Sequence, residues 1–255
     1  MIEKTKNKLS AVIITFNEEK NIERCIESLI GLADEIVVLD SFSTDKTEEI
    51  CKKHNVNFFQ HKFDGHIEQK NRAITYAKHP YIVSLDADEA ISPELKKSIL
   101  EEKNNWQADG YKFNRLTNYC GKWIKYCGWY PDRKLRLWNP EKGNWTGINP
   151  HDEYKMEEGS SVKFLKGDLY HYSYYTIEDH YKQVEKFTDI SAKAYFEKNI
   201  KSNFLKIAFK PIWKFIKDYI FKLGFLDGYL GFKICSISAK ATYIKYRKIK
   251  NLQKT

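Results

Sequence analysis

Residues 81–89 read Tyr-Ile-Val-Ser-Leu-Asp-Ala-Asp-Glu, so a run of apolar and β-branched side chains ends in three carboxylates. The apolar part has the length and composition of a buried strand. At the end of such a strand Asp86 and Asp88 point to one side and Ala87 to the other. Two carboxylates that converge on one point repel each other unless a cation lies between them. The stretch therefore predicts a buried strand that ends in a metal site.

Mg²⁺ and Mn²⁺ prefer carboxylate oxygens, and they keep open positions for the phosphates of a substrate. The alternative is an acidic turn that merely leads into the next helix, because Ser92 and Pro93 are a good helix start. The sequence before this stretch favours the metal site.

Strand-then-helix units fill the first third of the chain. The predicted strands are residues 9–15 (LSAVIIT), 35–40 (EIVVLD), 56–59 (VNFF) and 81–85 (YIVSL). Apolar strands that alternate with helices predict an α/β fold with a mostly parallel central sheet covered by helices. In such sheets ligands bind at the carboxyl ends of the strands. We therefore expect Asn17, Asp40 and the carboxylates of residues 86–88 to meet at one edge.

Two common phosphate-binding motifs are missing. The sequence contains neither Gly-x-Gly-x-x-Gly after the first strand nor Gly-x-x-x-x-Gly-Lys-Ser/Thr, which argues against a dinucleotide site and a P-loop. A parallel sheet that handles phosphate without such a loop needs another positive charge, and a divalent ion at Asp86 and Asp88 would supply it.

Several longer strings resemble one enzyme family. LSAVIITFNEEKNIERCIESLIGLADEIVVLDSFSTDKTEEI, QKNRAI and IVSLDADE look like the nucleotide-sugar half of family 2 glycosyltransferases with the GT-A fold. RLWNPEKGNW, PHDEY, LYHYSY and LGFLDGYLGF are similar to the lipopolysaccharide core β-glucosyltransferases of bacteria. The resemblance implies a GT-A domain over residues 1–200, with a nucleotide-sugar half (1–110) and an acceptor half (111–200).

The resemblance also implies the residues that bind a UDP-sugar. They are Thr15, Phe16, Asn17, Glu19, Asp40, Lys70 and Asp86. Phe16 is expected to stack on the base and Asp40 to accept a hydrogen bond from it, while Lys70 faces the base or the phosphates. Asp86 and Asp88 would hold the ribose and a Mg²⁺ or Mn²⁺ ion on the diphosphate, with Glu89 orienting its neighbours. The residues alone leave open that Asp40 is an N-cap and that Thr15 and Asn17 are turn residues.

Transfer of the sugar also needs a base, because the acceptor hydroxyl must lose its proton. A single general base without an enzyme nucleophile gives inversion at the anomeric carbon. The family typically shows His followed by Glu where this chain has His151, Asp152 and Glu153. We expect Asp152 to be the base, with Glu153 as the second candidate. A charged turn after Pro150 is the alternative for both.

His171 lies in LYHYSY, near the end of another predicted strand. In some GT-A enzymes a histidine in this region completes the metal site through an imidazole nitrogen, and a packed core histidine is the alternative. Arg133 and Arg136 can clamp a phosphate or an anionic acceptor, or can lie on a solvated strand face.

The last part of the chain carries its positive charge. Residues 201–255 hold 13 Lys or Arg and two acidic residues, whereas residues 1–200 hold 30 and 32. Lysines recur at helical spacing beside apolar and aromatic residues: Lys206, Lys210, Lys214, Lys217, Ile212, Trp213, Ile216, Tyr219 and Ile220. The pattern predicts a helical extension on an anionic membrane surface. Packing on its own domain and binding of single-stranded nucleic acid are alternatives, and we expect no nucleic acid.

The sequence thus predicts an inverting, metal-dependent hexosyltransferase. The resemblance implies a UDP-glucose or UDP-galactose donor and a lipid-linked glycan as acceptor. Five cysteines without paired spacing, no signal peptide and no long apolar span favour a cytoplasmic protein on the inner face of the membrane. The alternatives are a sugar nucleotidyltransferase, which normally needs a glycine-rich loop, and a binding module whose carboxylates are only structural.

Overall fold

The computed structural model describes residues 7–148 and 151–253 of the 255-residue chain. The chain forms two compact units, one from residues 1–115 and 132–172 and the other from residues 116–131 and 173–255. Each unit is described by itself. The domain boundaries expected at residues 110 and 200 stay predictions.

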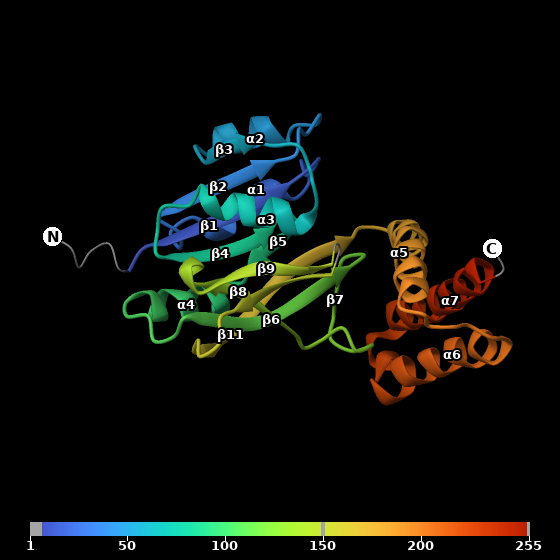
Figure 1. Ribbon diagram of the computed structural model, residues 1–255. Coiled ribbons are helices and arrows are strands. Elements are labelled where there is room, and N and C mark those ends of the chain that lie inside the picture. The colour runs from blue at the N-terminus through green and yellow to red at the C-terminus, as the bar shows by residue number, and fades with distance from the viewer. Residues whose placement is uncertain (1–6, 149–150, 254–255) are drawn as a thin grey trace. The chain divides into compact units, whose positions relative to one another are not determined.

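Parallel strands form one half of the sheet in the first unit (Figure 1). They are β1 (Leu9–Thr15), β2 (Glu35–Asp40), β3 (Asn57–Gln60) and β4 (Tyr81–Asp86), in the order β3-β2-β1-β4. The register aligns Thr15 with Asp40 and Ile14 with Asp86, so the carboxyl ends of β1, β2 and β4 meet at one edge. The four strands predicted from apolar runs are therefore confirmed.

Antiparallel strands continue this sheet beyond β4, in the order β8-β6-β11-β5. Their bounds are β5 (Glu89–Ile91), β6 (Gly110–Tyr119), β8 (Asp132–Trp138) and β11 (Val162–Tyr174), and β7 (Lys122–Ile124) pairs with β6. The ends of β6 and β11, together with β7, belong to the second unit. β9 (Gly143–Ile148) and β10 (His151–Met156) form a separate antiparallel hairpin.

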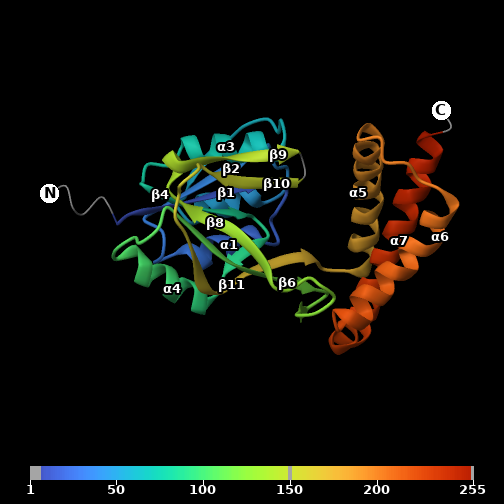
Figure 2. The same cartoon turned by 60° about the horizontal axis from the view of Figure 1, so that its bottom comes forward.

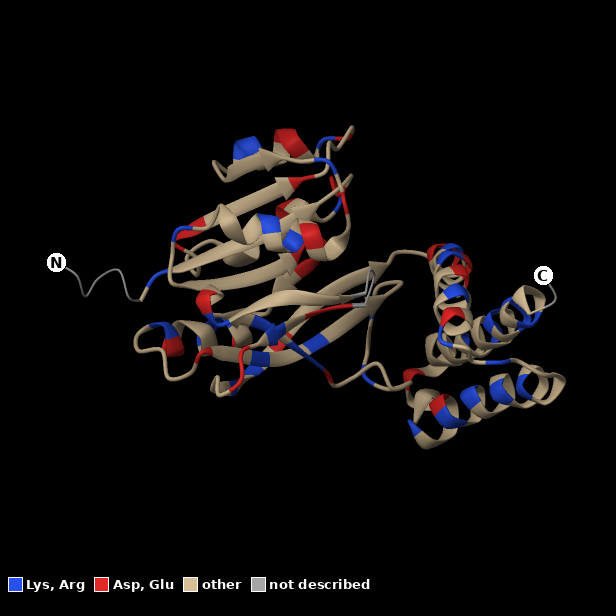
Figure 3. Cartoon of the chain, viewed as in Figure 1, with Lys and Arg blue, Asp and Glu red and all other residues tan. Residues whose placement is uncertain are grey.

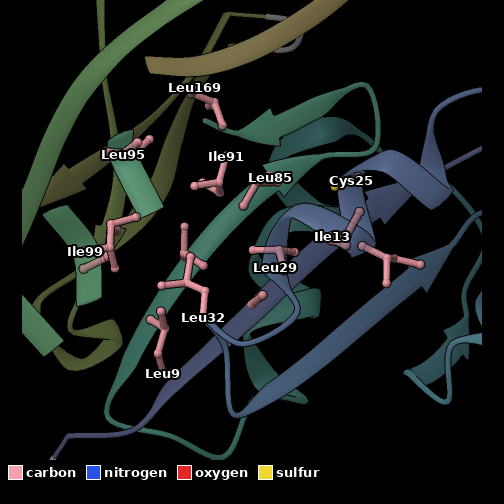
Figure 4. Packing of buried hydrophobic residues seen from close by; sticks show 14 of the residues in the cluster. Leu9, Ile13, Cys25, Leu29, Leu32, Leu85, Ile91, Leu95, Ile99 and Leu169 are labelled. Carbon is pink, nitrogen blue, oxygen red and sulfur yellow. The ribbon is translucent and has the colours of Figure 1, made fainter. Parts of the chain in front are cut away.

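Helices cover both faces of the parallel strands. They are α1 (Ile22–Leu29), α2 (Thr47–Lys53), α3 (His66–Thr75) and α4 (Pro93–Lys103). Because side chains alternate along a strand, Leu9 and Ile13 of β1 pack against α1 and α4 (Figure 4), while Val12 packs with Ala73 of α3 on the other face. The predicted α/β class is confirmed.

The turn after β4 places the acidic residues. Asp86 ends β4 and Glu89 begins β5, so Ala87 and Asp88 form the turn between them. The next helix, α4, begins as the sequence predicts, because the Ser92 hydroxyl accepts a hydrogen bond from the Leu95 amide at 3.2 Å.

Helices form most of the second unit (Figure 2). They are α5 (Ile177–Glu197), α6 (Phe204–Ile216), a π-helical turn (Lys217–Phe221), a 3₁₀ turn (Gly224–Asp227) and α7 (Gly228–Leu252). Ile234 and Cys235 of α7 form a core with Tyr119, Ile124 and Cys127. Within residues 7–148 and 151–253, each helix is too short or too polar to cross a membrane. All five cysteines are free thiols.

Candidate active site

A chain of opposite charges, whose two cations are buried, lies where β4 ends. The Lys70 ammonium group is 3.0 Å from Asp86 Oδ1 and 2.8 Å from Asp152 Oδ2. Arg136 Nη2 is 2.9 Å from Asp86 Oδ2 and 3.0 Å from Glu89 Oε1. Only 3% of the Lys70 side chain and 5% of the Arg136 side chain are exposed. Asp86 therefore lies between two cations.

The two cations keep Asp86 ionised. Burial would raise the pKa of Asp86, but the charges of Lys70 and Arg136 outweigh it and hold that pKa well below its usual range. Burial lowers the pKa of Arg136, and the carboxylates of Glu89 and Asp86 more than compensate and raise it. The expectation that Glu89 orients its neighbours agrees with its position, because its Oε2 accepts a hydrogen bond from the Asp86 amide at 3.0 Å.

The hairpin of β9 and β10 brings Asp152 to this cluster. Asn71, next to Lys70 on α3, donates a hydrogen bond to the Trp145 carbonyl and accepts one from the Trp145 amide, both at 3.0 Å. The Lys70 ammonium group lies 4.5 Å from the centre of the Trp145 ring. Since neighbouring residues of a strand point to opposite sides, Asp152 faces Lys70 whereas Glu153 is exposed. The structure thus brings Asp152 to Asp86 through Lys70 and leaves Glu153 outside.

Asp88 and His171 form a second pair beside the cluster. Asp88 Oδ2 is 3.2 Å from His171 Nε2, and both side chains are partly exposed. His171 lies in β11 opposite Glu89, and the neighbouring Tyr172 amide donates a hydrogen bond to the Asp88 carbonyl at 2.9 Å. Two adjacent ligands of an octahedral Mg²⁺ or Mn²⁺ ion are about 3 Å apart when their bonds measure about 2.1 Å. The Asp88 and His171 atoms have that spacing, so this pair fits a divalent ion.

Asp86 does not share this arrangement. Its oxygens contact Lys70 and Arg136. Among the described residues, three possible ligand atoms lie within 4.8 Å of one another only at Glu23, Glu27 and His54. Asp86, Asp88 and His171 therefore do not form a three-ligand cluster. The role of Asp86 as a metal ligand stays a prediction.

Glu18 is an acidic neighbour that sequence reasoning missed. Burial raises the pKa of Glu18 to about 7, the hydrogen bond from Asn21 opposes this, and the nearby charges of Asp88, Asp45 and Asp86 add to the rise. Glu18 lies in the loop after β1, inside TFNEEKN. Its position three residues after a predicted buried strand is the sequence signal from which Glu18 could have been predicted.

The loops after β1 and β2 hold each other. The Asn17 amide donates to Ser43 Oγ at 2.7 Å, and Asn17 Oδ1 accepts from the Thr44 amide at 2.8 Å. In the same way Glu19 Oε2 accepts from the Lys46 amide at 3.1 Å. These contacts give Asn17 the turn role that the residues alone left open, and they fix the backbone beside the site.

Asp40 is fully buried and already hydrogen-bonded. Its carboxylate accepts from the Ser43 amide at 2.8 Å, from the Ser43 hydroxyl and from the Gln60 side chain at 3.2 Å. The cap residue of α2 is Lys46, so the alternative that Asp40 is the N-cap of that helix is wrong. Its contact with a base stays a prediction.

Thr15 and Phe16 lie beside this loop pair. Thr15 is 4% exposed, and its hydroxyl is buried without a hydrogen-bond partner among the described residues. Phe16 and Phe42 are 56% and 55% exposed. The chain thus presents two aromatic rings in the loops that follow β1 and β2, where the sequence indicated one stacking ring.

The comparisons with known proteins identify the family of this chain. The model of the family described as "Glycosyl transferase family 2" matches residues 10–167, which include the strands β1 to β4 and the hairpin. The chain belongs to glycosyl transferase family 2. The predicted GT-A fold and the predicted glycosyltransferase activity are thereby confirmed.

Relatives of this glycosyltransferase match over most of their lengths. An uncharacterized glycosyltransferase of Rickettsia bellii is 29% identical over 262 residues, which cover 99% of this chain and 89% of the relative. The lipopolysaccharide core biosynthesis glycosyltransferase LpsC of Rhizobium meliloti is 28% identical over 222 residues, which cover 83% of this chain and 80% of LpsC.

Solved structures resemble the glycosyltransferase more distantly. TarS of S. aureus (residues 1–349), in complex with UDP, is 16% identical with a TM-score of 0.46, covering 97% of this chain and 91% of that one. Glucosyl-3-phosphoglycerate synthase of Mycobacterium tuberculosis, in complex with Mn²⁺ and UDP-glucose, is 21% identical with a TM-score of 0.37, covering 46% and 48%.

Proposed function

We propose that this family 2 glycosyltransferase moves a hexose from a UDP-sugar to a lipid-linked or lipopolysaccharide core glycan, with inversion and with the help of Mg²⁺ or Mn²⁺. The observation that carries the proposal is the cluster at the end of β4, where Lys70 joins Asp86 to Asp152 and Asp88 pairs with His171. The similarity to LpsC favours the lipopolysaccharide core as acceptor.

The donor half of the site suits a nucleotide diphosphate. Asp88 and His171 would hold the divalent ion, which stabilises the negative charge that develops on the leaving diphosphate. Arg136 Nε and Nη1 are buried without hydrogen-bond partners among the described residues. Buried donors without partners are rare in proteins, and an anionic ligand would satisfy them. Phe16 and Phe42, each more than half exposed, supply a stacking surface for the base, and Thr15 ends the neighbouring strand β1.

Asp86 holds Lys70 and Arg136 in place beside that ligand. Its two oxygens already contact these cations, at 3.0 and 2.9 Å, so a metal ion at Asp86 would add a further positive charge next to Lys70 and Arg136. We therefore assign Asp86 to positioning the two cations and the ribose, and Asp88 to the metal.

Asp152 is the base in this proposal. Its side chain is 13% exposed and ion-paired with Lys70, so it is held in one orientation at the site, as a base must be to receive a proton from a bound hydroxyl. Lys70 attracts the incoming diphosphate, and a shift of its ammonium group toward phosphate would free the Asp152 carboxylate for the acceptor. Glu153 is exposed on the other side of β10 and serves as the control.

The acceptor places the enzyme at a membrane. A lipid-linked glycan stays at the bilayer surface, and the basic segment of residues 201–255 suits attachment to an anionic inner leaflet. We propose a cytoplasmic enzyme that is peripheral on the inner face of the cytoplasmic membrane and binds no nucleic acid.

A screen of UDP-sugars for release of UDP tests the proposal. We expect UDP release from UDP-glucose or UDP-galactose in the presence of Mn²⁺ and a lipopolysaccharide core acceptor, and a product with inverted anomeric configuration by NMR. Asp88→Asn should lose this activity, whereas Glu101→Gln, at an exposed carboxylate of α4, should keep it. Release of pyrophosphate from a nucleoside triphosphate and a sugar phosphate would instead support a nucleotidyltransferase.

A further inference from the structure

Helix α6 exposes an unusual amount of apolar surface. None of its residues is buried, and six of its large apolar side chains have exposed fractions between 37% and 72%: Phe204, Leu205, Phe209, Ile212, Trp213 and Ile216. A helix that packed both sides into a protein would bury several such residues. One side of α6 is therefore free of cover within its unit.

The spacing of these residues gathers them on one side. At about 100° per residue, Leu205, Phe209, Ile212, Trp213 and Ile216 lie within an arc of about 100°. Lys206, Lys210 and Lys214, with Lys217 directly after the helix, fall within the neighbouring arc of about 80°, and Figure 3 shows basic residues at intervals along α6. An apolar stripe thus runs beside a basic stripe.

The remaining side of α6 attaches the helix to its unit. Phe215, in the remaining arc, packs with the core that contains Ile234 and Cys235 of α7. Its ring centre lies 5.8 Å from that of Phe232. Because this side accounts for the packing of α6, the second unit does not need the apolar stripe to hold the helix in place.

The turns after α6 extend the apolar surface. Exposed fractions between 43% and 68% occur at Ile220, Phe221, Leu223, Phe225, Leu226 and Tyr229. The ring centres of Trp213 and Phe221 are 5.9 Å apart, so the exposed apolar surface of α6 continues into these turns.

Two of the four lysines beside the stripe are available to a partner. Lys214 is paired with Asp218 at 2.8 Å and Lys206 donates to the Lys201 carbonyl at 2.7 Å, whereas Lys210 and Lys217 are exposed. Residues 201–255 contain 13 Lys or Arg against two acidic residues. The charge of this surface is complementary to a layer of anionic groups.

We propose that α6 and the turns after it form a membrane-docking surface that lies in the headgroup layer of an anionic bilayer. The apolar stripe enters the boundary between headgroups and acyl chains, and the lysines contact lipid phosphates at its side. Aromatic and leucine side chains beside lysines are the composition of in-plane interfacial helices, and basic residues near a leaflet add electrostatic attraction. The proposal names the element behind the membrane location proposed above, and vesicle binding tests it independently of sugar transfer.

Sedimentation of the full chain with vesicles is the test. We expect binding to phosphatidylcholine vesicles that contain phosphatidylserine at low salt, release as salt rises within the range that screens surface charge, and weak binding to phosphatidylcholine alone. Lys210→Gln with Lys217→Gln should weaken binding roughly 30-fold, the loss expected for two lysines near an anionic surface. Lys182→Gln with Lys198→Gln, at exposed positions of α5 and of the cap residue that follows it, removes the same charge and should change binding less than threefold.

The apolar stripe has its own pair of variants. Phe209→Ser with Trp213→Ser should weaken vesicle binding at least tenfold, because the rings no longer enter the interface. Tyr181→Ser with Phe196→Ser, which removes two exposed rings of α5, should leave binding unchanged. Circular dichroism and UDP binding check that every variant is folded.

Four results would overturn the proposal. The α6 variants and the α5 variants could bind vesicles equally well, or the wild type could bind neutral and anionic vesicles equally. The third is that Phe209→Ser with Trp213→Ser converts a dimer to a monomer without affecting vesicle binding, which would make the stripe an interface between copies of the chain. Tight binding of a single-stranded oligonucleotide that competes with vesicles would likewise assign the lysines to nucleic acid.

Discussion

Replacement of Arg136 by methionine removes the cation that joins Asp86 to Glu89. Glu89 is 1% exposed, and without Arg136 its nearest cation is Arg115, at 3.5 Å. Removal of one partner of a buried ion pair costs about 3–5 kcal/mol, because the remaining charge stays buried without compensation. We therefore expect Arg136→Met to lower the free energy of unfolding by about 3–5 kcal/mol.

Thermal and urea unfolding of the full chain measure this loss. One kcal/mol shifts the melting temperature of a chain of about 250 residues by about 2–4 °C, so the expected decrease is about 6–20 °C. Lys134→Met is the matched control, since it removes a cation from the same strand at a pair with Asp132 in which both side chains are at least 32% exposed. Exposed pairs contribute less than about 1 kcal/mol.

If Lys134→Met lowered the free energy of unfolding as much as Arg136→Met does, burial would not determine the loss and the reasoning would be refuted. The reasoning would also be refuted if Arg136→Met were as stable as the wild type. The triple replacement Arg136→Met, Asp86→Leu and Glu89→Leu should regain part of the loss, because it leaves no buried charge of this cluster unpaired.

Three further predictions concern protonation and catalysis. The pKa of Glu18 is about 7 in the folded chain and 4.5 in the unfolded chain, so the free energy of unfolding should fall by at most roughly 3 kcal/mol as the pH rises from 4.5 to 7. Urea unfolding of Glu18→Gln should show a smaller fall over this pH range. An equal fall in the variant would contradict the assignment. Burial lowers the pKa of His180 to about 4, so stability should decrease as the pH falls from 6.5 toward 4, and less so in His180→Phe. Asp152→Asn should reduce turnover by roughly 10² or more with UDP affinity near that of the wild type, whereas Glu153→Gln should stay active; the reverse pattern would move the base to Glu153.

The parallel strands could be predicted because their signal is local. LSAVIIT, EIVVLD and YIVSLD are apolar runs in which each side chain is placed by strand alternation alone. The register then brings Thr15, Asp40 and Asp86 to one edge. The amphipathic α6 followed from its lysine and aromatic spacing in the same way.

The contacts between distant segments could not be predicted from such patterns. Asp152 meets Lys70 across 82 positions of sequence, and this contact depends on the two hydrogen bonds between Asn71 and Trp145. The sequence of β8 left Arg136 as either a phosphate clamp or a solvated residue, and only its pairing with Asp86 and Glu89 shows that the solvated alternative is wrong. The burial of Asp40 by its own turn likewise depends on backbone geometry that its neighbours in sequence do not reveal.

Metal-dependent UDP binding tests the central claim most directly. Isothermal titration of UDP into the full chain, with and without Mn²⁺, should show affinity that Mn²⁺ increases in the wild type and in Glu101→Gln. Asp88→Asn and His171→Phe should bind UDP equally with and without Mn²⁺, because the pair at 3.2 Å that would hold the ion is lost. If Mn²⁺ increases the UDP affinity of Asp88→Asn as much as that of the wild type, the proposed site at the end of β4 is contradicted.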